Sequence, residues 1–147
     1  MRQKLNCIML IDDDEPTNFL NSMIIEEGNY ADHIQIKDSG KKALAYLANS
    51  QSTGYCSKQY PWPDLIFLDI NMPAMNGWEF LEKLKEQRNE QEEREVIIML
   101  TTSLNPDDKN RADAIKNVVD FKHKTLTEEI LNEILATYFM DQKTLAN

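Results

Sequence analysis

Residues 64–77 read DLIFLDINMPAMNG, and this stretch decides the fold. The apolar run Leu65–Ile70 has the length of a buried β-strand, and apolar residues then recur at helical spacing from Trp78 to Leu84. Asp69 stands near the end of the run, so a carboxylate is expected where the strand ends. The stretch therefore predicts a strand, a turn and a helix, with an acidic side chain at the turn.

The same alternation of a short apolar run and an amphipathic stretch occurs five times along the chain. The other strands are predicted at Cys7–Ile11, His33–Lys37, Val96–Leu100 and Val118–His123, and the other helices at Pro16–Glu27, after Ser39, at Pro106–Asn117 and after Thr127. In the first helix, Leu20, Met23 and Ile24 supply the apolar spacing. This order predicts an α/β fold, a five-stranded parallel sheet with helices on both faces.

Two long polar connections interrupt the alternation. Asn49–Pro63 is predicted to be a surface loop, and Lys85–Glu95 a solvated extension of the third helix. Neither is expected to be a partner site.

Composition excludes several classes of protein. The 147 residues fit one domain, and 16 basic against 25 acidic residues give a net charge of −9, which disfavours direct binding of nucleic acid. No apolar run approaches the length of a membrane span and no signal-peptide core is present, so no membrane contact and a cytoplasmic location are expected. Cys7 is predicted to pack in the core and Cys56 to lie in a polar loop, and their spacing argues against a zinc site.

Polar side chains follow four of the predicted strands. They are Asp12, Asp13 and Asp14 after the first, Asp69 and then Asn71 at the third, Thr101, Thr102 and Ser103 after the fourth, and Lys124 after the fifth. Ligand sites of parallel sheets lie beyond the carboxyl ends of the strands, so these groups are expected to converge. Clustered carboxylates need a cation or a raised pKa, and Mg²⁺ suits hard oxygen ligands. Asp14 and Glu15 could instead serve only as the negative start of a helix.

The chemistry that fits this set is phosphoryl transfer to a carboxylate. Asp69 would be the nucleophile, Mg²⁺ and Lys124 would neutralise the phosphoryl oxygens, and Thr101 would hydrogen-bond one of them. The four glycines are scattered singly rather than gathered in a phosphate-binding loop, so the phosphoryl group is expected to come from another protein.

Four segments resemble the response-regulator receiver domains of two-component signalling: CIMLIDDDEPTN, DLIFLDINMPAMNG, VIIMLTTSLNPDD and DFKHKTLT. The resemblance implies a stand-alone, chemotaxis-type receiver of flavodoxin-like (βα)5 order, a single domain over residues 1–147 with a core of about 5–141 and no output domain. It implies that Asp69 is the phosphoacceptor and that Asp13 and Asp69 bind Mg²⁺ directly. Asp12 would act mainly through water and Asn71 through its backbone carbonyl.

The resemblance also implies a switch and a set of partners. Thr101 matches the switch hydroxyl, Phe121 the switch aromatic, and Pro73 and Gly77 the turn after the phosphoacceptor. A histidine kinase or phosphotransfer protein would supply the phosphoryl group. Phosphorylation would then change a surface that binds a downstream protein target and supports a homodimer. The chain departs from the family at Thr125, where proline usually follows the lysine and is commonly cis; we predict a trans bond, because a cis bond before threonine costs about 2.5–4 kcal/mol.

Two other functions compete with a phosphoacceptor signalling protein. A magnesium-dependent aspartyl phosphatase needs a second carboxylate two residues after the nucleophile, and that position holds Asn71. A degenerate receiver with only a structural role would have lost an acidic residue or Lys124, and all are present. The chain is therefore expected to be a phosphoacceptor signalling protein rather than an enzyme. Its only reactions would be transfer of a phosphoryl group to its own aspartate and hydrolysis of the product.

Overall fold

The computed structural model describes residues 4–55, 58–88, 95–102, 105–115 and 118–139, and the predicted alternation of strands and helices is confirmed there. The strands are β1 (Leu5–Ile11), β2 (Ala31–Lys37), β3 (Leu65–Asp69), β4 (Val96–Thr101) and β5 (Val118–His123). The helices are α1 (Glu15–Glu27), α2 (Gly40–Ser52), α3 (Gly77–Gln87), α4 (Pro106–Asp113) and α5 (Glu128–Tyr138).

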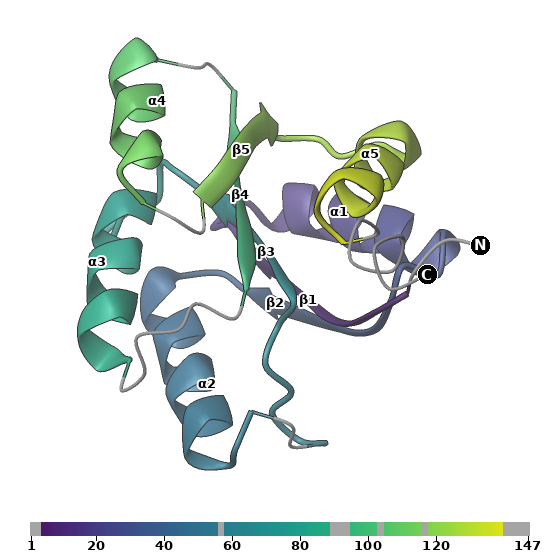
Figure 1. The fold of residues 1–147 in the computed structure, drawn as a ribbon, viewed down its shortest axis with the longest axis horizontal. Helices are drawn as coiled ribbons and strands as arrows, with labels where there is room; N and C mark the ends of the chain where they lie inside the picture. The colour runs from purple at the N-terminus through teal and green to yellow at the C-terminus, as the bar shows by residue number, and fades with distance from the viewer. Residues whose placement is uncertain (1–3, 56–57, 89–94, 103–104, 116–117, 140–147) are drawn as a thin grey trace.

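All five strands lie parallel in one sheet with the order β2-β1-β3-β4-β5 (Figure 1). Helices α1 and α5 cover one face, and α2, α3 and α4 cover the other. The order reverses direction between β1 and β3, so the carboxyl ends of these two neighbouring strands flank the switch point where parallel sheets bind ligands.

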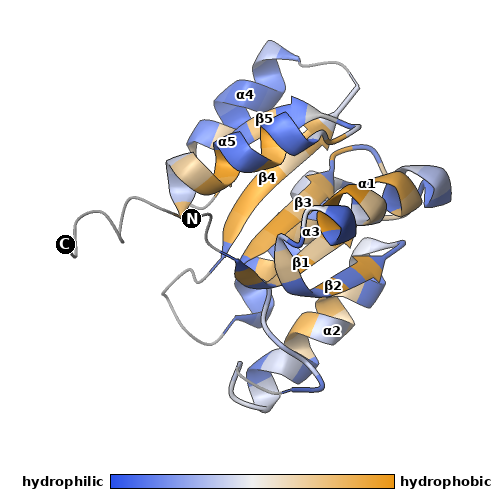
Figure 2. Cartoon of the chain, turned by 90° about the vertical axis from the view of Figure 1, so that its right-hand side faces the viewer, coloured by the Kyte–Doolittle hydropathy of each residue, from blue (hydrophilic) through white to orange (hydrophobic). Residues whose placement is uncertain are grey.

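Two apolar layers hold the helices on the sheet. One joins α2, α3 and α4 to the strands, and the other joins α1 and α5 to them. The central strands are apolar along most of their length, as the colouring of Figure 2 shows, because both of their faces are covered. Cys7 is fully buried among them, as predicted.

The inward face of α1 differs from the prediction. Leu20 and Met23 are exposed, with 50% and 37% of their surface accessible, and Ile24 is half-buried. The buried positions are instead Asn18, Asn21 and Ile25. An apolar periodicity marks the core face only where the opposing surface is apolar, and α1 also packs against polar backbone at the strand ends.

In the described part of each polar connection, some side chains are buried where a solvated segment was predicted. Residues 49–52 continue α2, and Trp62 is buried in the apolar layer with 7% of its surface exposed. Helix α3 ends at Gln87, and Arg88 then forms an ion pair with Glu95, whose side chain has no exposed surface. Residues 89–94 and Cys56 lie outside the described residues.

Remaining differences concern the limits of elements. Helix α4 ends at Asp113 rather than Asn117, and β2 begins two residues before His33. Ser39 and Thr127 cap α2 and α5 as predicted, because each hydroxyl accepts a hydrogen bond from a backbone N–H in the first turn. No described helix is long and apolar enough to cross a membrane.

Candidate functional site

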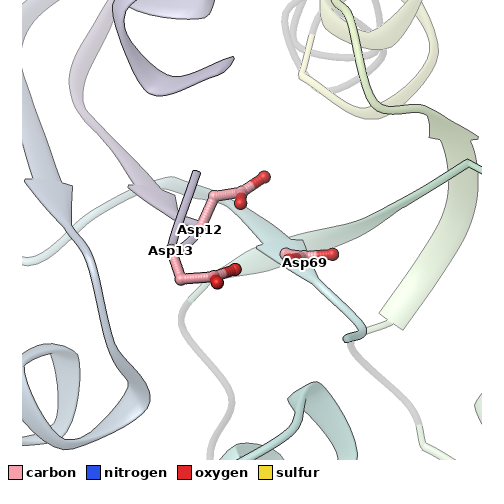
Figure 3. Close-up of side chains that lie close together, drawn as sticks. All are labelled: Asp12, Asp13 and Asp69. Carbon is pink, nitrogen blue, oxygen red and sulfur yellow. The ribbon is translucent and has the colours of Figure 1, made fainter. Parts of the chain in front are cut away.

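Three aspartates meet at the carboxyl edge of the sheet, where β1 and β3 end. One carboxylate oxygen from each of Asp12, Asp13 and Asp69 lies within 4.8 Å of the others. Figure 3 shows the three side chains gathered at the two strand ends, with the Asp13 carboxylate directed toward Asp69. The predicted convergence of these residues is confirmed.

Asp12 is held from both its side chain and its backbone. Its Oδ1 accepts a hydrogen bond of 2.9 Å from the Asp14 N–H, and its carbonyl accepts one of 2.7 Å from Asn18 Nδ2. The residue is 2% exposed, and its Oδ2 is buried and accepts no hydrogen bond from the described residues. Asp13, one position along, is exposed. The pair therefore offers one buried and one accessible carboxylate.

Asp69 is the last residue of β3 and is 1% exposed. Its Oδ1 accepts a hydrogen bond of 3.2 Å from the Asn71 N–H, and the turn behind it is closed by Gly77 N–H donating to the Ile70 carbonyl at 2.8 Å. A Cβ on Gly77 would lie 2.8 Å from the Asp69 carbonyl oxygen, so the start of α3 can approach the strand this closely only because position 77 has no side chain.

Lys124 completes the cluster from the end of β5. Its Nζ lies 3.3 Å from Asp69 Oδ2 and 3.6 Å from Asp12 Oδ1, and its side chain is 20% exposed. The described residues contain no cis peptide bond, so the predicted trans bond between Lys124 and Thr125 is confirmed. Lysine reaches the carboxylates from this trans backbone because its stem is long and flexible.

Burial and mutual repulsion disturb the acidic groups. Burial, and then the neighbouring Asp12 carboxylate, raise the pKa of Asp69 to about 6, against the opposing effect of Lys124. Burial likewise raises the pKa of Asp12. Burial would lower the pKa of Lys124, but the two carboxylates outweigh it and raise that pKa. The cluster therefore carries excess negative charge that a divalent cation would relieve.

Thr101, Asn71 and Phe121 were also predicted to belong to the site. Thr101 ends β4, is 7% exposed, and follows Leu100, the residue paired with Asp69 across the sheet. Asn71 is exposed on the loop after β3. Phe121 is half-buried against the apolar layer and pairs with Met99, below the edge where Lys124 lies. Ser103 lies outside the described residues.

Asn18 and Asn21 were not predicted from the sequence, and both hydrogen-bond the backbone beside the site. The available signal was their spacing, since with Ile25 they repeat at helical intervals on one face of α1. Amides at core-facing positions indicate backbone groups that need partners.

Comparison with known proteins agrees with this geometry. Residues 8–136 match the family model of the response regulator receiver domain. A crystal structure of a two-component response regulator from Cytophaga hutchinsonii is 32% identical with a TM-score of 0.80, covering 99% of this chain and 100% of that one. Chemotaxis protein CheY4 of Vibrio cholerae shares the fold, with a TM-score of 0.67 at 24% identity.

Curated relatives that are similar in sequence are longer than this chain. Response regulator Rcp1 of Synechocystis is 32% identical over 101 residues, covering 69% of this chain and 65% of its own length. A probable cyclic di-GMP phosphodiesterase of Vibrio cholerae is 32% identical over 146 residues, covering 98% of this chain but 29% of its own. The fold and the family match define a receiver domain of the response-regulator type. The chain belongs to the response regulator receiver family.

Proposed function

We propose that Asp69 is the phosphoacceptor of this receiver domain and takes its phosphoryl group from a histidine kinase or phosphotransfer protein. One observation carries the proposal: the Asp69 carboxylate stands at the end of β3 beside the Lys124 ammonium, at 3.3 Å, and the carboxylates of Asp12 and Asp13. A carboxylate oxygen attacks the phosphorus, the bond to the donor breaks, and an aspartyl phosphate forms.

Mg²⁺ fits the residues of this cluster. The donors are hard carboxylate oxygens, and Asp12 Oδ2 is a buried oxygen that accepts no hydrogen bond within the described part of the chain. Asp13 and Asp69 would hold the ion directly, Asp12 mainly through water, and Asn71 through its backbone carbonyl. When bound, Mg²⁺ would supply positive charge to the phosphoryl oxygens.

The chain's own residues supply the rest of the stabilisation. Lys124 holds a positive charge between Asp12 and Asp69, where it lowers the repulsion that an incoming phosphoryl group meets. Thr101 lies at the end of the neighbouring strand, and its hydroxyl would hydrogen-bond a phosphoryl oxygen. These two residues and Asp69 form the proposed catalytic set.

Switching follows from the same contacts. The phosphoryl group on Asp69 carries about −1.5 to −2 charge, in place of the single charge of the ionised carboxylate. Thr101 and Lys124 would move toward that charge, and Phe121 would turn inward from its half-buried position. The population then shifts toward a state with a changed surface on α4, β5 and α5. That surface binds a downstream protein target and pairs two copies as a homodimer, which light scattering of the phosphorylated chain would detect.

An aspartyl phosphatase is not favoured by the site. Its general acid and base would stand two residues after Asp69, and Asn71 is an exposed amide that cannot exchange a proton in that role. The Lys124 ion pairs also disfavour a receiver that is only structural.

Intact-mass spectrometry after incubation with acetyl phosphate and Mg²⁺ tests the proposal. Wild type should gain one phosphoryl group, and Asp69→Asn, which is nearly isosteric, should gain none while keeping its circular dichroism spectrum. Asp32→Asn is the matched control, because Asp32 is an exposed aspartate near the start of β2, at the opposite edge of the sheet from the cluster. Equal labelling of wild type and Asp69→Asn would refute the assignment.

A further inference from the structure

Asn21 spans the loop that carries Lys124. It lies on α1, is 1% exposed, and uses both ends of its amide. Its Nδ2 donates to the Lys124 carbonyl at 3.2 Å, and its Oδ1 accepts from the Leu126 N–H at 3.0 Å. The side chain therefore bridges the two residues on either side of Thr125, from a position more than 100 residues earlier in the chain.

This loop needs a partner to fix its backbone. Thr125 is exposed, and a threonine leaves φ free where a proline would restrict it. Lysine has a flexible four-carbon stem, so the place of its ammonium depends on where the backbone starts that stem. Two hydrogen bonds to one buried amide hold that starting point against α1.

Asn18 makes the corresponding contact one turn earlier in α1. Its Nδ2 donates to the Asp12 carbonyl at 2.7 Å. Helix α1 thus holds the backbone of both members of the ion pair between Asp12 and Lys124, whose charged atoms are 3.6 Å apart. The two asparagines account for the polar inward face of α1.

We propose that Asn21 is a positioning residue for phosphoryl transfer: it aims Lys124 at Asp69 by holding the Lys124–Leu126 backbone against α1. The proposal rests on the function proposed above. The Asn21 amide hydrogen-bonds the Lys124 carbonyl and the Leu126 N–H rather than a carboxylate, so its effect on the reaction passes through Lys124.

Kinetics and metal binding separate this role from general damage. If Lys124 is released from the carboxylates, transfer slows, but Mg²⁺ binding stays equal or becomes tighter because a neighbouring positive charge has moved away. If the site instead collapses, both transfer and Mg²⁺ binding weaken. Slower transfer without weaker Mg²⁺ binding is therefore expected only for a positioning role.

The experiment measures the initial rate of labelling of Asp69 by acetyl phosphate, and Mg²⁺ affinity by calorimetry, in Asn21→Ala. Asn21→Leu is the second variant, since leucine has the same branched arrangement of side-chain heavy atoms as asparagine and makes neither hydrogen bond. Tyr46→Phe is the matched control, because it removes a buried hydrogen bond to the Pro61 backbone before β3, at the opposite edge of the sheet. Asn21→Ala and Asn21→Leu are also made in a Lys124→Ala chain.

We expect labelling at least tenfold slower in both Asn21 variants, Mg²⁺ affinity not reduced by more than twofold, and a wild-type rate in Tyr46→Phe. In the Lys124→Ala chain the Asn21 substitutions should change the rate by less than twofold, since the residue they act through is gone. Wild-type rates in the Asn21 variants, or an equal slowing with and without Lys124, would overturn the proposal. If Lys124→Ala takes no label, the proposal is judged from the labelling rates and the Mg²⁺ affinities of the Asn21 variants that retain Lys124. An unlabelled wild type would instead refute the proposed function.

Discussion

Gly77→Ala should damage the site through a steric contact with Asp69. A Cβ at position 77 would lie 2.8 Å from the Asp69 carbonyl oxygen, 3.0 Å from Met99 Cε and 3.1 Å from Ile70 Cα. Ordinary van der Waals contact begins near 3.4 Å, so the backbone of Asp69 or the start of α3 must move by about 0.6 Å. Neither group is a flexible side-chain end that could turn away.

The expected cost follows from these contacts. Overpacking of this kind destabilises a protein by about 1–3 kcal/mol. Alanine is preferred over glycine by up to about 1 kcal/mol inside a helix, and by less at the first position of α3. The net loss in the free energy of unfolding should be about 1–2 kcal/mol. Because the displaced atoms include the backbone of Asp69, labelling by acetyl phosphate should also slow several-fold.

Gly40→Ala is a matched control for this substitution. Gly40 likewise follows an N-cap at the first position of its helix, and its added Cβ would lie 2.6 Å from Met75 Sδ. A methionine side chain can rotate away, so this variant should lose less than about 1 kcal/mol and keep its labelling rate. Urea unfolding and intact-mass kinetics compare the two. A Gly77→Ala chain as stable and as readily labelled as Gly40→Ala would refute the steric argument.

Three further perturbations have expected outcomes. Asp13→Ala should weaken Mg²⁺ binding in calorimetry by at least tenfold and change the free energy of unfolding by less than about 0.5 kcal/mol, since Asp13 is exposed. In EDTA, the free energy of unfolding of wild type relative to Asp69→Asn should fall as the pH rises from about 4 to about 6 and then level off. The pKa of Asp69 is raised to about 6, so in this range the folded chain holds a proton that the unfolded chain has lost, and a flat difference would contradict the assignment. Arg88→Ala should cost about 3–5 kcal/mol in urea unfolding, because it leaves the fully buried Glu95 carboxylate without its ion pair, and should not change the labelling of Asp69.

The central strands could be predicted because their neighbours on both faces of the sheet are apolar. Strands β1, β3 and β4 each contain a continuous apolar run because helices cover both faces of the sheet, and their limits differ from the prediction by one or two residues. Convergence of Asp12, Asp13, Asp69 and Lys124 follows from topology alone, since the carboxyl ends of parallel strands share one edge.

What could not be predicted depends on contacts between distant parts of the chain. Leu20 and Met23 are exposed and Asn21 is buried because α1 faces the backbone of a loop more than 100 residues away. Trp62 is buried although its surroundings in the sequence are polar, and Arg88 beside it is only 10% exposed in its ion pair. Local periodicity carries no information on such partners.

Locating the phosphoryl group within the wild-type chain tests the central claim most directly. The chain is incubated with acetyl phosphate and Mg²⁺, digested at low temperature, and analysed by tandem mass spectrometry. We predict that the group is found on Asp69, and on neither Asp12 nor Asp13, the two other carboxylates of the cluster. A phosphoryl group on any residue other than Asp69 would contradict the account.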